Sequence, residues 1–373
     1  MTIRCSAFLL LGALALAPAA CGGDDDDDGG DGAEAFSTIL AVGTDFSTAG
    51  VATTISVPGL EVTTGAVEGV ASTDPVVRHL GDRLFIVNRL GQDNVTVLEA
   101  DDLTLVAQIS TGAGSNPQDV AVVGDLLYVA AFNSPGLLVV DLTRPDDGVI
   151  DTVDLSDRDP DGLPNCGTVM ADGADVLTVC SLLDDADFLA PRGPGVAVKL
   201  DVDGLDVVEE WPTEIRPFGL AYAPVGGSDV WVATVDDFAD PGAGGCIQDL
   251  SFLDDLEPGC VVSNEDLGGF ASAMAWDPAT ERLWVTVTTG FDPDDFGPIG
   301  NLVSVDIGTG EVEPVAMADG ARPMDLALCP SGHLAVSDAT RGVRVLAPGA
   351  SDELTAAPLD IGLPPVSNGL VCY

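Results

Sequence analysis

The sequence predicts an all-β fold, a seven-bladed β-propeller in which each blade is a four-stranded antiparallel sheet. Three observations lead to this prediction: a repeated four-strand unit, turn residues between its strands, and two chain ends that complement each other. The unit is clearest in 116–155, where four short runs rich in β-branched residues are separated by Gly, Pro, Asn and Asp. A sheet of this size cannot cover both of its own faces, so it needs copies on either side.

Related units begin near positions 73, 164, 216, 270 and 322. Their starts are roughly 42 to 53 residues apart, at or slightly above the usual period of a propeller blade. Each unit opens with a short strand, often after a proline, and continues with an apolar second strand. The excess over the usual period is explained by insertions in loops.

The two chain ends supply the remaining blade. Residues 368–373 look like a first strand without a successor, and 37–42, 50–57 and 60–70 look like the three strands that it lacks. We therefore expect the C-terminal strand to be the inner strand of a blade whose outer strands are N-terminal, which leaves no open sheet edge. Six blades lie between the ends, so the total is seven. Six or eight blades remain alternatives, because 216–267 is hard to divide into strands.

Residues 1–20 predict a signal peptide, with Arg4 before an apolar run at 8–16 and small residues before Cys21. The apolar run is too short to favour a transmembrane helix. The sequence Ala19-Ala20-Cys21 resembles the end of a bacterial lipoprotein lipobox, with Pro18 in place of the usual Leu. The resemblance implies that Cys21 bears the lipid anchor. Residues 21–35 would then form an acidic Gly/Asp linker to the propeller domain at 36–373. The alternative is a secreted protein that is cleaved elsewhere.

Six further cysteines predict three disulfides, which suit an oxidising compartment. One pair flanks a hairpin turn at Asp172-Gly173, a second brackets another candidate hairpin, and a third connects two opening strands. The expected bridges are Cys166–Cys180, Cys246–Cys260 and Cys329–Cys372. Metal binding by these cysteines is less favoured because the chain has no Cys-Xaa-Xaa-Cys pair.

Three long loops are expected on one face of the ring. Segments 182–194, 236–245 and 290–300 connect second to third strands in consecutive blades, and the inter-blade segment 157–164 lies on the same side. Long loops on one face of a rigid scaffold are a usual place for binding. The candidate binding face comprises Asp184, Asp185, Asp187, Asp236, Asp237, Asp240, Asp292, Asp294 and Asp295.

A calcium site is predicted at Asp157, Asp159 and Asp161, because carboxylates at alternate positions before a glycine resemble the first half of an EF-hand loop. Thr168 stands where the bidentate Glu of that loop is expected. Other ligands would have to complete the site, for example the Leu163 carbonyl, Asn165 or a neighbouring loop. The alternative is a solvated, Asp-rich turn.

The chain has 13 basic and 61 acidic residues, giving a formal net charge of −48. This balance argues against nucleic acid and against direct contact with anionic lipid surfaces. It suits a basic partner, weak Ca²⁺ sites or a surface kept soluble in high salt. Only two histidines are present, and there is no haem-attachment motif or Gly-Xaa-Ser-Xaa-Gly elbow, so the sequence predicts no catalytic residue and no organic cofactor.

The pattern of Asn116-Pro117, Val120-Ala121-Val122 and Leu127-Tyr128-Val129-Ala130 resembles the YVTN-type propeller repeats. These repeats occur in bacterial surface proteins and in propellers related to lactonases and to the d1-haem domain of nitrite reductases. The resemblance covers most of 36–373 and implies a fold rather than an activity.

Two functions are therefore compared. One is an exported cell-envelope lipoprotein that presents its acidic loop face to a protein or glycan partner, with Ca²⁺ as candidate cofactor and membrane contact only through the lipid anchor. The other is a lactonase-like hydrolase or lyase that uses loop carboxylates as acid and base. The lack of a His-centred or nucleophile motif favours the binding scaffold.

Overall fold

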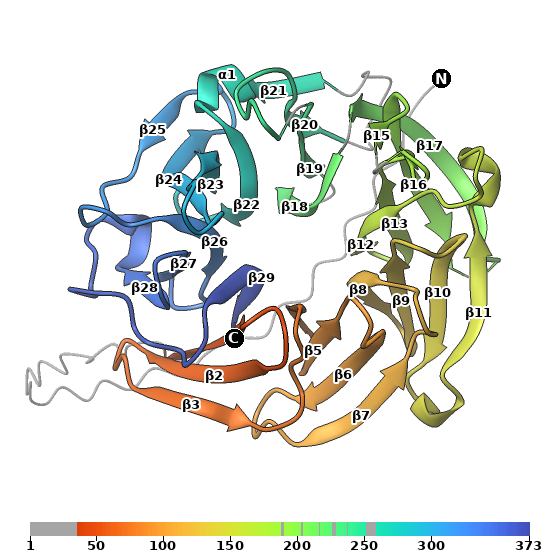
Figure 1. Cartoon of the computed structure of the whole chain (residues 1–373), viewed down its shortest axis with the longest axis horizontal. Coiled ribbons are helices and arrows are strands. Elements are labelled where there is room, and N and C mark those ends of the chain that lie inside the picture. Colours follow the sequence, from red (N-terminus) through yellow and green to blue (C-terminus); the bar gives the residue numbers. More distant parts are fainter. Residues whose placement is uncertain are drawn as a thin grey trace, which may run out of the picture. The chain divides into compact units, whose positions relative to one another are not determined.

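The computed structural model describes residues 36–187, 190–202, 204–215, 217–225, 229–236, 238–250 and 259–373. The expected signal peptide, the anchor Cys21, the acidic linker and Asp237 lie outside these residues. The described part of the chain forms seven blades arranged in a ring (Figure 1), almost entirely of antiparallel strands. The predicted fold class is confirmed.

The strands of each blade are given in order from the innermost to the outermost. Blade 1 contains β29 (Pro365–Cys372), β1 (Ser37–Thr44), β2 (Gly50–Val57) and β3 (Val62–Val67). Blade 2 contains β4 (Pro75–Leu80), β5 (Arg83–Asn88), β6 (Asn94–Glu99) and β7 (Leu105–Ser110). Blade 3 contains β8 (Pro117–Val123), β9 (Leu126–Ala131), β10 (Gly136–Asp141) and β11 (Val149–Asp154). Blade 4 contains β12 (Cys166–Asp172), β13 (Asp175–Cys180), β16 (Pro194–Asp201) and β17 (Asp206–Ile215).

The remaining blades follow the same order. Blade 5 contains β18 (Pro217–Val225), β19 (Asp229–Thr234), β20 (Cys246–Asp249) and β21 (Gly259–Ser263). Blade 6 contains β22 (Phe270–Asp277), β23 (Arg282–Phe291), β24 (Pro298–Asp306) and β25 (Val312–Pro314). Blade 7 contains β26 (Pro323–Leu328), β27 (Leu334–Asp338) and β28 (Val343–Leu346). Two short strands, β14 (Leu183–Asp184) and β15 (Ala190–Pro191), pair within a loop of blade 4, and the α-helix α1 (Asn264–Leu267) joins blades 5 and 6.

The C-terminal strand closes the ring as predicted. β29 pairs antiparallel with β1, with Leu40 opposite Val371, and Thr38 and Tyr373 exchange backbone hydrogen bonds of 2.7 and 2.9 Å. The Cys329–Cys372 disulfide connects β29 to the end of the neighbouring inner strand β26. The other two expected disulfides are also present, Cys166–Cys180 and Cys246–Cys260. Three structural disulfides indicate an exported protein.

The hydrophobic core lies between the faces of adjacent blades. In one cluster, Phe85 and Val87 of β5 pack against Leu127 and Val129 of β9, and all four are buried. Burying each such side chain contributes roughly 1.5–3 kcal/mol to the stability of the fold. Because the adjacent blade provides the surface that buries it, every blade depends on its neighbours for stability. The backbone packs closely as well, since a Cβ on Gly136 would lie 1.8 Å from the Val153 carbonyl oxygen.

Blade 7 differs from the expected four strands. Its outer position is taken by an irregular segment held to β28 by isolated bridges, Val343 with Leu359 and Leu346 with Glu353. Pro348 and Pro358 interrupt this segment, and a proline has no backbone N–H to donate to a sheet. The expected long loop at 290–300 is also shorter than predicted, because β23 and β24 extend to Phe291 and from Pro298 and leave only 292–297 as the turn.

Candidate functional site

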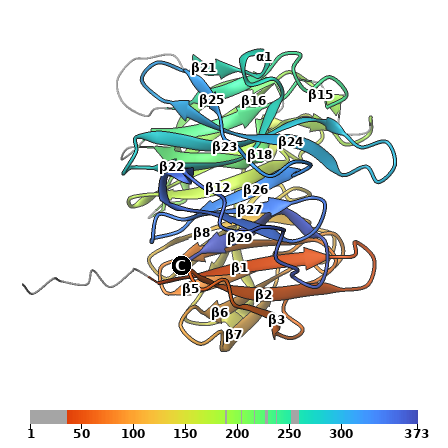
Figure 2. The same ribbon diagram turned by 90° about the vertical axis from the view of Figure 1, so that its left-hand side faces the viewer.

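The connections from second to third strands and those between blades lie on one side of the ring, here called the loop rim. Contacts between the two kinds of connection confirm this placement: Arg89 Nη2 bonds Asp74 Oδ1 at 2.6 Å, and Asp93 Oδ1 accepts from the Asn116 N–H at 3.0 Å. The β23–β24 hairpin projects from this rim (Figure 2). The loop rim therefore carries the loops between second and third strands of blades 4, 5 and 6.

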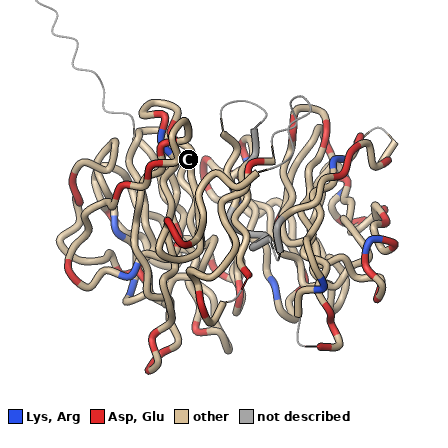
Figure 3. The backbone as a smooth tube through the Cα atoms, turned by 90° about the horizontal axis from the view of Figure 1, so that it is seen from above, with Lys and Arg blue, Asp and Glu red and all other residues tan. Residues whose placement is uncertain are grey.

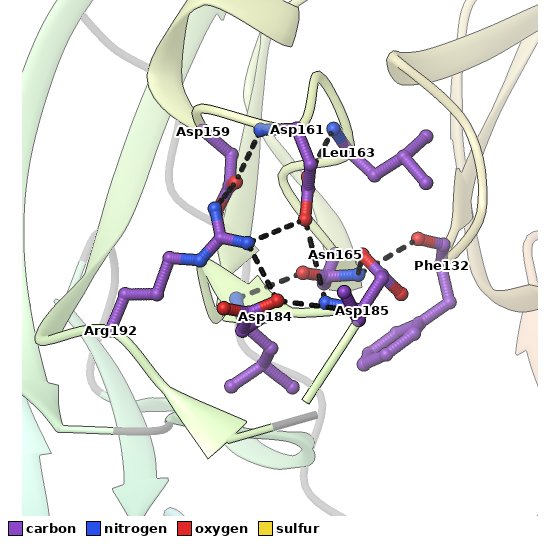
Figure 4. A network of polar contacts seen from close by, with 10 residues as sticks. Phe132, Asp159, Asp161, Leu163, Asn165, Asp184, Asp185 and Arg192 are labelled. Carbon is purple, nitrogen blue, oxygen red and sulfur yellow. Dashed lines mark hydrogen bonds and ion pairs between the residues drawn. The ribbon is translucent and has the colours of Figure 1, made fainter. Parts of the chain in front are cut away.

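In blade 4, Arg192 gathers three carboxylates from two segments (Figure 4). Its Nη1 lies 2.6 Å from Asp159 Oδ1, and its Nη2 lies 2.8 Å from Asp161 Oδ2 and 3.0 Å from Asp184 Oδ1. Asp159 and Asp161 come from the connection before β12, whereas Asp184 and Arg192 belong to the loop between β13 and β16. The guanidinium thus ties an inter-blade connection to an acidic loop.

Burial and hydrogen bonding shift the pKa values of these carboxyl groups in different directions. Asp159 is only 3% exposed, and burial raises its pKa. The pKa of Asp161 is lowered although burial opposes this, because the Leu163 N–H donates a hydrogen bond to its carboxylate. The hydrogen bond from Arg192 lowers the pKa of Asp184. Asp161 and Asp184 are therefore anionic at neutral pH, and Arg192 is their shared counter-ion.

Asp157 lies apart from this cluster. Its exposed carboxylate contacts Arg158, which also contacts Glu210 of β17. Asn165, another expected ligand, donates from Nδ2 to Asp185 Oδ2 at 3.2 Å and accepts from the Leu183 N–H at 2.9 Å. Among the described residues, no group of three or more His, Cys, Asp or Glu side chains is arranged to hold a metal ion. Ca²⁺ at Asp157, Asp159 and Asp161 stays a prediction.

In blade 6, Arg322 serves the acidic turn in a similar way. It contacts both carboxylate oxygens of Asp295 at 3.0 Å, in the bidentate geometry that favours Arg, and lies 3.5 Å from Asp292. The hydrogen bond from Arg322 lowers the pKa of Asp295. Asp294, at the tip of the same turn, is exposed to solvent.

In blade 5, the uncharged side chain of Asn264 holds the base of the acidic loop. Asn264 of α1 donates to the carbonyls of Thr234 and Gly244 at 3.0 and 2.9 Å, and the Phe238 ring meets the Phe270 ring edge-on at 5.5 Å. Asp236 and Asp240 are exposed on this loop. The three loops occupy consecutive blades, with their bases fixed and several carboxylates exposed to solvent.

Acidity alone does not distinguish the loop rim. Figure 3 shows Asp and Glu on loops at both ends of the ring, with few Lys or Arg. On the opposite rim, Asp102 and Asp306 accept hydrogen bonds from backbone N–H groups within their own tight turns. The loop rim differs in having longer loops that Arg192, Arg322 and Asn264 hold in place.

A second polar group, not expected from the sequence, lies in the centre of the ring. Arg78 of β4 donates from Nε to Asp119 of β8 at 2.7 Å and from Nη2 to Asn368 Oδ1 of β29 at 3.2 Å. The Tyr222 ring of β18 lies 5.7 Å from the Arg78 guanidinium carbon, and Asp325 of β26 lines the same cavity. These five residues, here called the channel cluster, come from five different inner strands.

Bulges in the inner strands direct the two carboxylates of the channel cluster. The pairing of β8 with β9 skips Gln118, and that of β26 with β27 skips Met324, so Asp119 and Asp325 follow an extra residue. A bulge changes the direction of the next side chain. Asp119 then accepts from the Val169 N–H at 3.1 Å and Asp325 from the Leu370 N–H at 3.0 Å, each in the inner strand of the next blade.

The sequence held a signal for this cluster. Asp119 and Asp325 stand two positions after the opening proline of their units, where an inner strand would ordinarily be apolar. The two histidines lie elsewhere: His333 Nδ1 is 3.0 Å from Ser331 Oγ, and the His79 ring is 5.4 Å from that of Tyr373. Among the described residues, no helix is long and apolar enough to cross a membrane.

Comparisons with known proteins support the fold. No family model and no curated protein matches the chain. Hydrazine synthase from Kuenenia stuttgartiensis is similar in structure, with 16% identity, a TM-score of 0.57 and coverage of 79% of this chain and 89% of that chain. Dihydro-heme d1 dehydrogenase NirN has 14% identity and a TM-score of 0.53, covering 89% of this chain and 75% of that chain. The Pan2 WD40 domain of Neurospora crassa has 10% identity and a TM-score of 0.51, covering 73% and 75%. At these identities the likeness shows that the chain is a β-propeller.

Proposed function

We propose that this protein is a binding scaffold of the cell envelope, tethered through Cys21, whose acidic loop rim binds a protein with a basic surface. One observation carries the proposal: in three consecutive blades, long loops with fixed bases present exposed carboxylates on the same rim. These carboxylates belong to Asp185, Asp187, Asp236, Asp240 and Asp294. A preorganised acidic surface costs little ordering on binding and attracts a cationic partner from a distance.

A charge-matched pair of variants tests this proposal. In the first, the five exposed carboxylates named above become amides by Asp→Asn substitution. In the second, five exposed carboxylates of the opposite rim are changed in the same way: Asp82, Asp101, Asp125, Asp146 and Asp206. Both variants have the same net charge, so a difference between them reports position and not charge alone.

The probe is cytochrome c, a basic protein, with affinity measured by calorimetry at physiological salt. We expect the loop-rim variant to bind about tenfold more weakly than wild type and the opposite-rim variant to bind nearly as well as wild type. Equal weakening in both variants would reject a dedicated rim and leave only non-specific charge attraction. Labelling of Cys21 by a radioactive fatty acid, and its loss in Cys21→Ser, tests the tether separately.

We further propose Ca²⁺ as a cofactor at Asp157, Asp159 and Asp161. The support is local and concerns two of these residues: Asp159 Oδ2 is buried without a hydrogen-bond partner, and Asp159 and Asp161 share the single charge of Arg192 with Asp184. A specific site raises the melting temperature at low free Ca²⁺, because a ligand that binds only the folded state stabilises it. Melting curves with Ca²⁺ and with Mg²⁺ at equal ionic strength test this, and identical curves would reject the Ca²⁺ site.

A further inference from the structure

The centre of the ring contains two cavities that share part of their lining. The larger has a volume of about 450 Å³ and is bordered by residues of all seven inner strands, including the apolar side chains of Met170, Met274 and Leu328. The smaller, about 160 Å³, is lined by Arg78, Tyr222, Asp325 and Asn368 of the channel cluster, together with Ala273 and Leu326. Apolar walls with a few converging polar groups are typical of small-molecule sites.

Asp119 and Asp325 occupy matching positions in this channel but differ in charge compensation. Both follow a bulge, both accept a backbone N–H from the next blade, and they are 0% and 2% exposed. Asp119 is paired with Arg78 at 2.7 Å. Among the described residues, Asp325 takes part in no ion pair; its carboxylate oxygens accept from the N–H groups of Leu326 and Leu370. Arg78 forms a direct ion pair with Asp119 only, and its charge acts on Asp325 from a longer distance.

Asn368 adds an unused donor to the same cavity. Its Oδ1 accepts from Arg78, but its Nδ2 has no hydrogen-bond partner although the residue is only 6% exposed. A buried donor without an acceptor is costly and calls for a partner. The smaller cavity thus offers an anionic acceptor at Asp325 and a free donor at Asn368.

We propose that the channel binds a small amphipathic amine, with its ammonium group on Asp325, a neighbouring hydroxyl or carbonyl oxygen on Asn368 Nδ2, and its apolar chain along Met170, Met274 and Leu328. The ammonium forms a direct ion pair with Asp325. The oxygen accepts the free hydrogen of Asn368. An anionic ligand is disfavoured, because it would place a second negative charge beside Asp325.

The charged and titratable groups around Asp325 make the binding dependent on pH. Arg78 from β4 and Tyr222 from β18 line the same cavity as Asp325, and Asp119 from β8 forms an ion pair with Arg78. Burial raises the pKa of Asp325 to about 7, and Arg78 opposes the rise. Alkyl ammonium groups stay charged up to about pH 10, as Lys does, so a change in affinity near neutral pH reports Asp325.

The probe is 2-amino-1-hexanol. Hexylamine lacks its hydroxyl group, 1-hexanol lacks its ammonium group, and hexanoate lacks both and carries a negative charge. Calorimetry on the folded wild-type protein should give the strongest binding for the amino alcohol, weaker binding for hexylamine and none for hexanoate. If only ionised Asp325 binds, affinity at about pH 8.5 should exceed that at about pH 5.5 by about 30-fold. Hexanol binding as tightly as the amino alcohol, or no binding by either amine, would overturn the proposal.

Two variants test whether the amine binds at Asp325 in the smaller cavity. Asp325→Asn keeps the size of the side chain and removes its charge, and should abolish both amine binding and its pH dependence. A second variant tests the site if Asp325→Asn does not fold. Ala273→Leu fills the smaller cavity while leaving Asp325 intact, and should also block amine binding. Asp125→Asn, on the opposite rim, is the control and should bind as wild type does. Unchanged affinity in folded Asp325→Asn would show that Asp325 is only a neutral structural group.

Discussion

Arg78 Nε and Asp119 Oδ1 lie 2.7 Å apart and join the inner strands of adjacent blades in the centre of the ring. The Asp119 carboxylate is fully buried and its second oxygen accepts from the Val169 N–H of a third blade. One ion pair therefore connects blades 2, 3 and 4. Its removal should affect the whole ring and not a single strand.

Arg78→Met should destabilise the protein by about 3–5 kcal/mol, because it leaves the Asp119 carboxylate buried without a counter-ion. Urea denaturation followed by circular dichroism measures the loss. Arg341→Met is the control, since Arg341 and Asp360 form an exposed pair that solvent screens and that should contribute little to stability. Equal, small losses in both variants would contradict a structural role for the buried pair.

Asp325 should make stability depend on pH. Its pKa is about 7 in the folded protein and close to the ordinary 3.8 when unfolded, so the folded state binds the proton more tightly. The contribution of Asp325 to stability is then greatest below pH 4, falls as pH rises from about 4 to about 7, and changes no further above that range, with a slope of at most about 1.4 kcal/mol per pH unit.

In Asp325→Asn this component of the pH dependence should disappear. Urea denaturation of wild type and variant across the pH range gives the difference between the two curves, which removes the contribution of all other carboxylates. The variant should gain relative to wild type as pH rises. A difference that is constant with pH would contradict the raised pKa.

The disulfide that closes the ring should contribute more to stability than a disulfide within a blade. Cys329 and Cys372 are 43 residues apart, whereas Cys166 and Cys180 are 14 apart and lie on paired strands. Chain-entropy arguments give about 4 and about 3 kcal/mol for loops of these lengths. Thermal unfolding of the two double Cys→Ala variants measures the order, and a larger loss for Cys166/Cys180 would contradict it.

Arg192→Gln should loosen the acidic loop of blade 4. Three carboxylates lose their shared cation, and the pKa of Asp184 should rise towards its usual value because the Arg192 hydrogen bond that lowers it is gone. Carboxyl NMR titration follows Asp184, and hydrogen exchange follows the Asp185 amide, which donates to Asp161 Oδ2 at 3.4 Å. Arg322→Gln should leave both readouts unchanged, since Arg322 serves blade 6.

The sequence was sufficient to predict contacts between segments whose residue patterns complement each other. The incomplete strand pattern at 368–373 and the three unpaired strands after the acidic linker predicted the pairing of β29 with β1. Cysteines around two hairpin turns predicted two disulfides, and cysteines at matching places in two opening strands predicted the third. In blade 7 the outermost position forms only isolated bridges to β28, because its prolines lack the backbone N–H groups that a regular strand donates.

The channel cluster was missed for a different reason. Arg78, Asp119 and Asp325 lie on separate blades far apart in the chain, and each looks like one polar residue in an apolar strand. The bulges that turn Asp119 and Asp325 toward their neighbours depend on strand register, which residue pattern does not specify. The separation of Asp157 from Asp159 and Asp161 escaped prediction because Arg192 and Arg158, from different connections, divide the carboxylates between them.

Pairing of β29 with β1 also orders events during biosynthesis. Strands β1 to β3 are made first, yet they lack their innermost neighbour until Val371 and Cys372 have left the ribosome. Truncation before Pro365 would remove all eight residues of β29 and leave the backbone of β1 exposed, a ready template for intermolecular pairing. A premature stop codon just before Pro365 should therefore yield aggregated protein and not a slightly shortened ring.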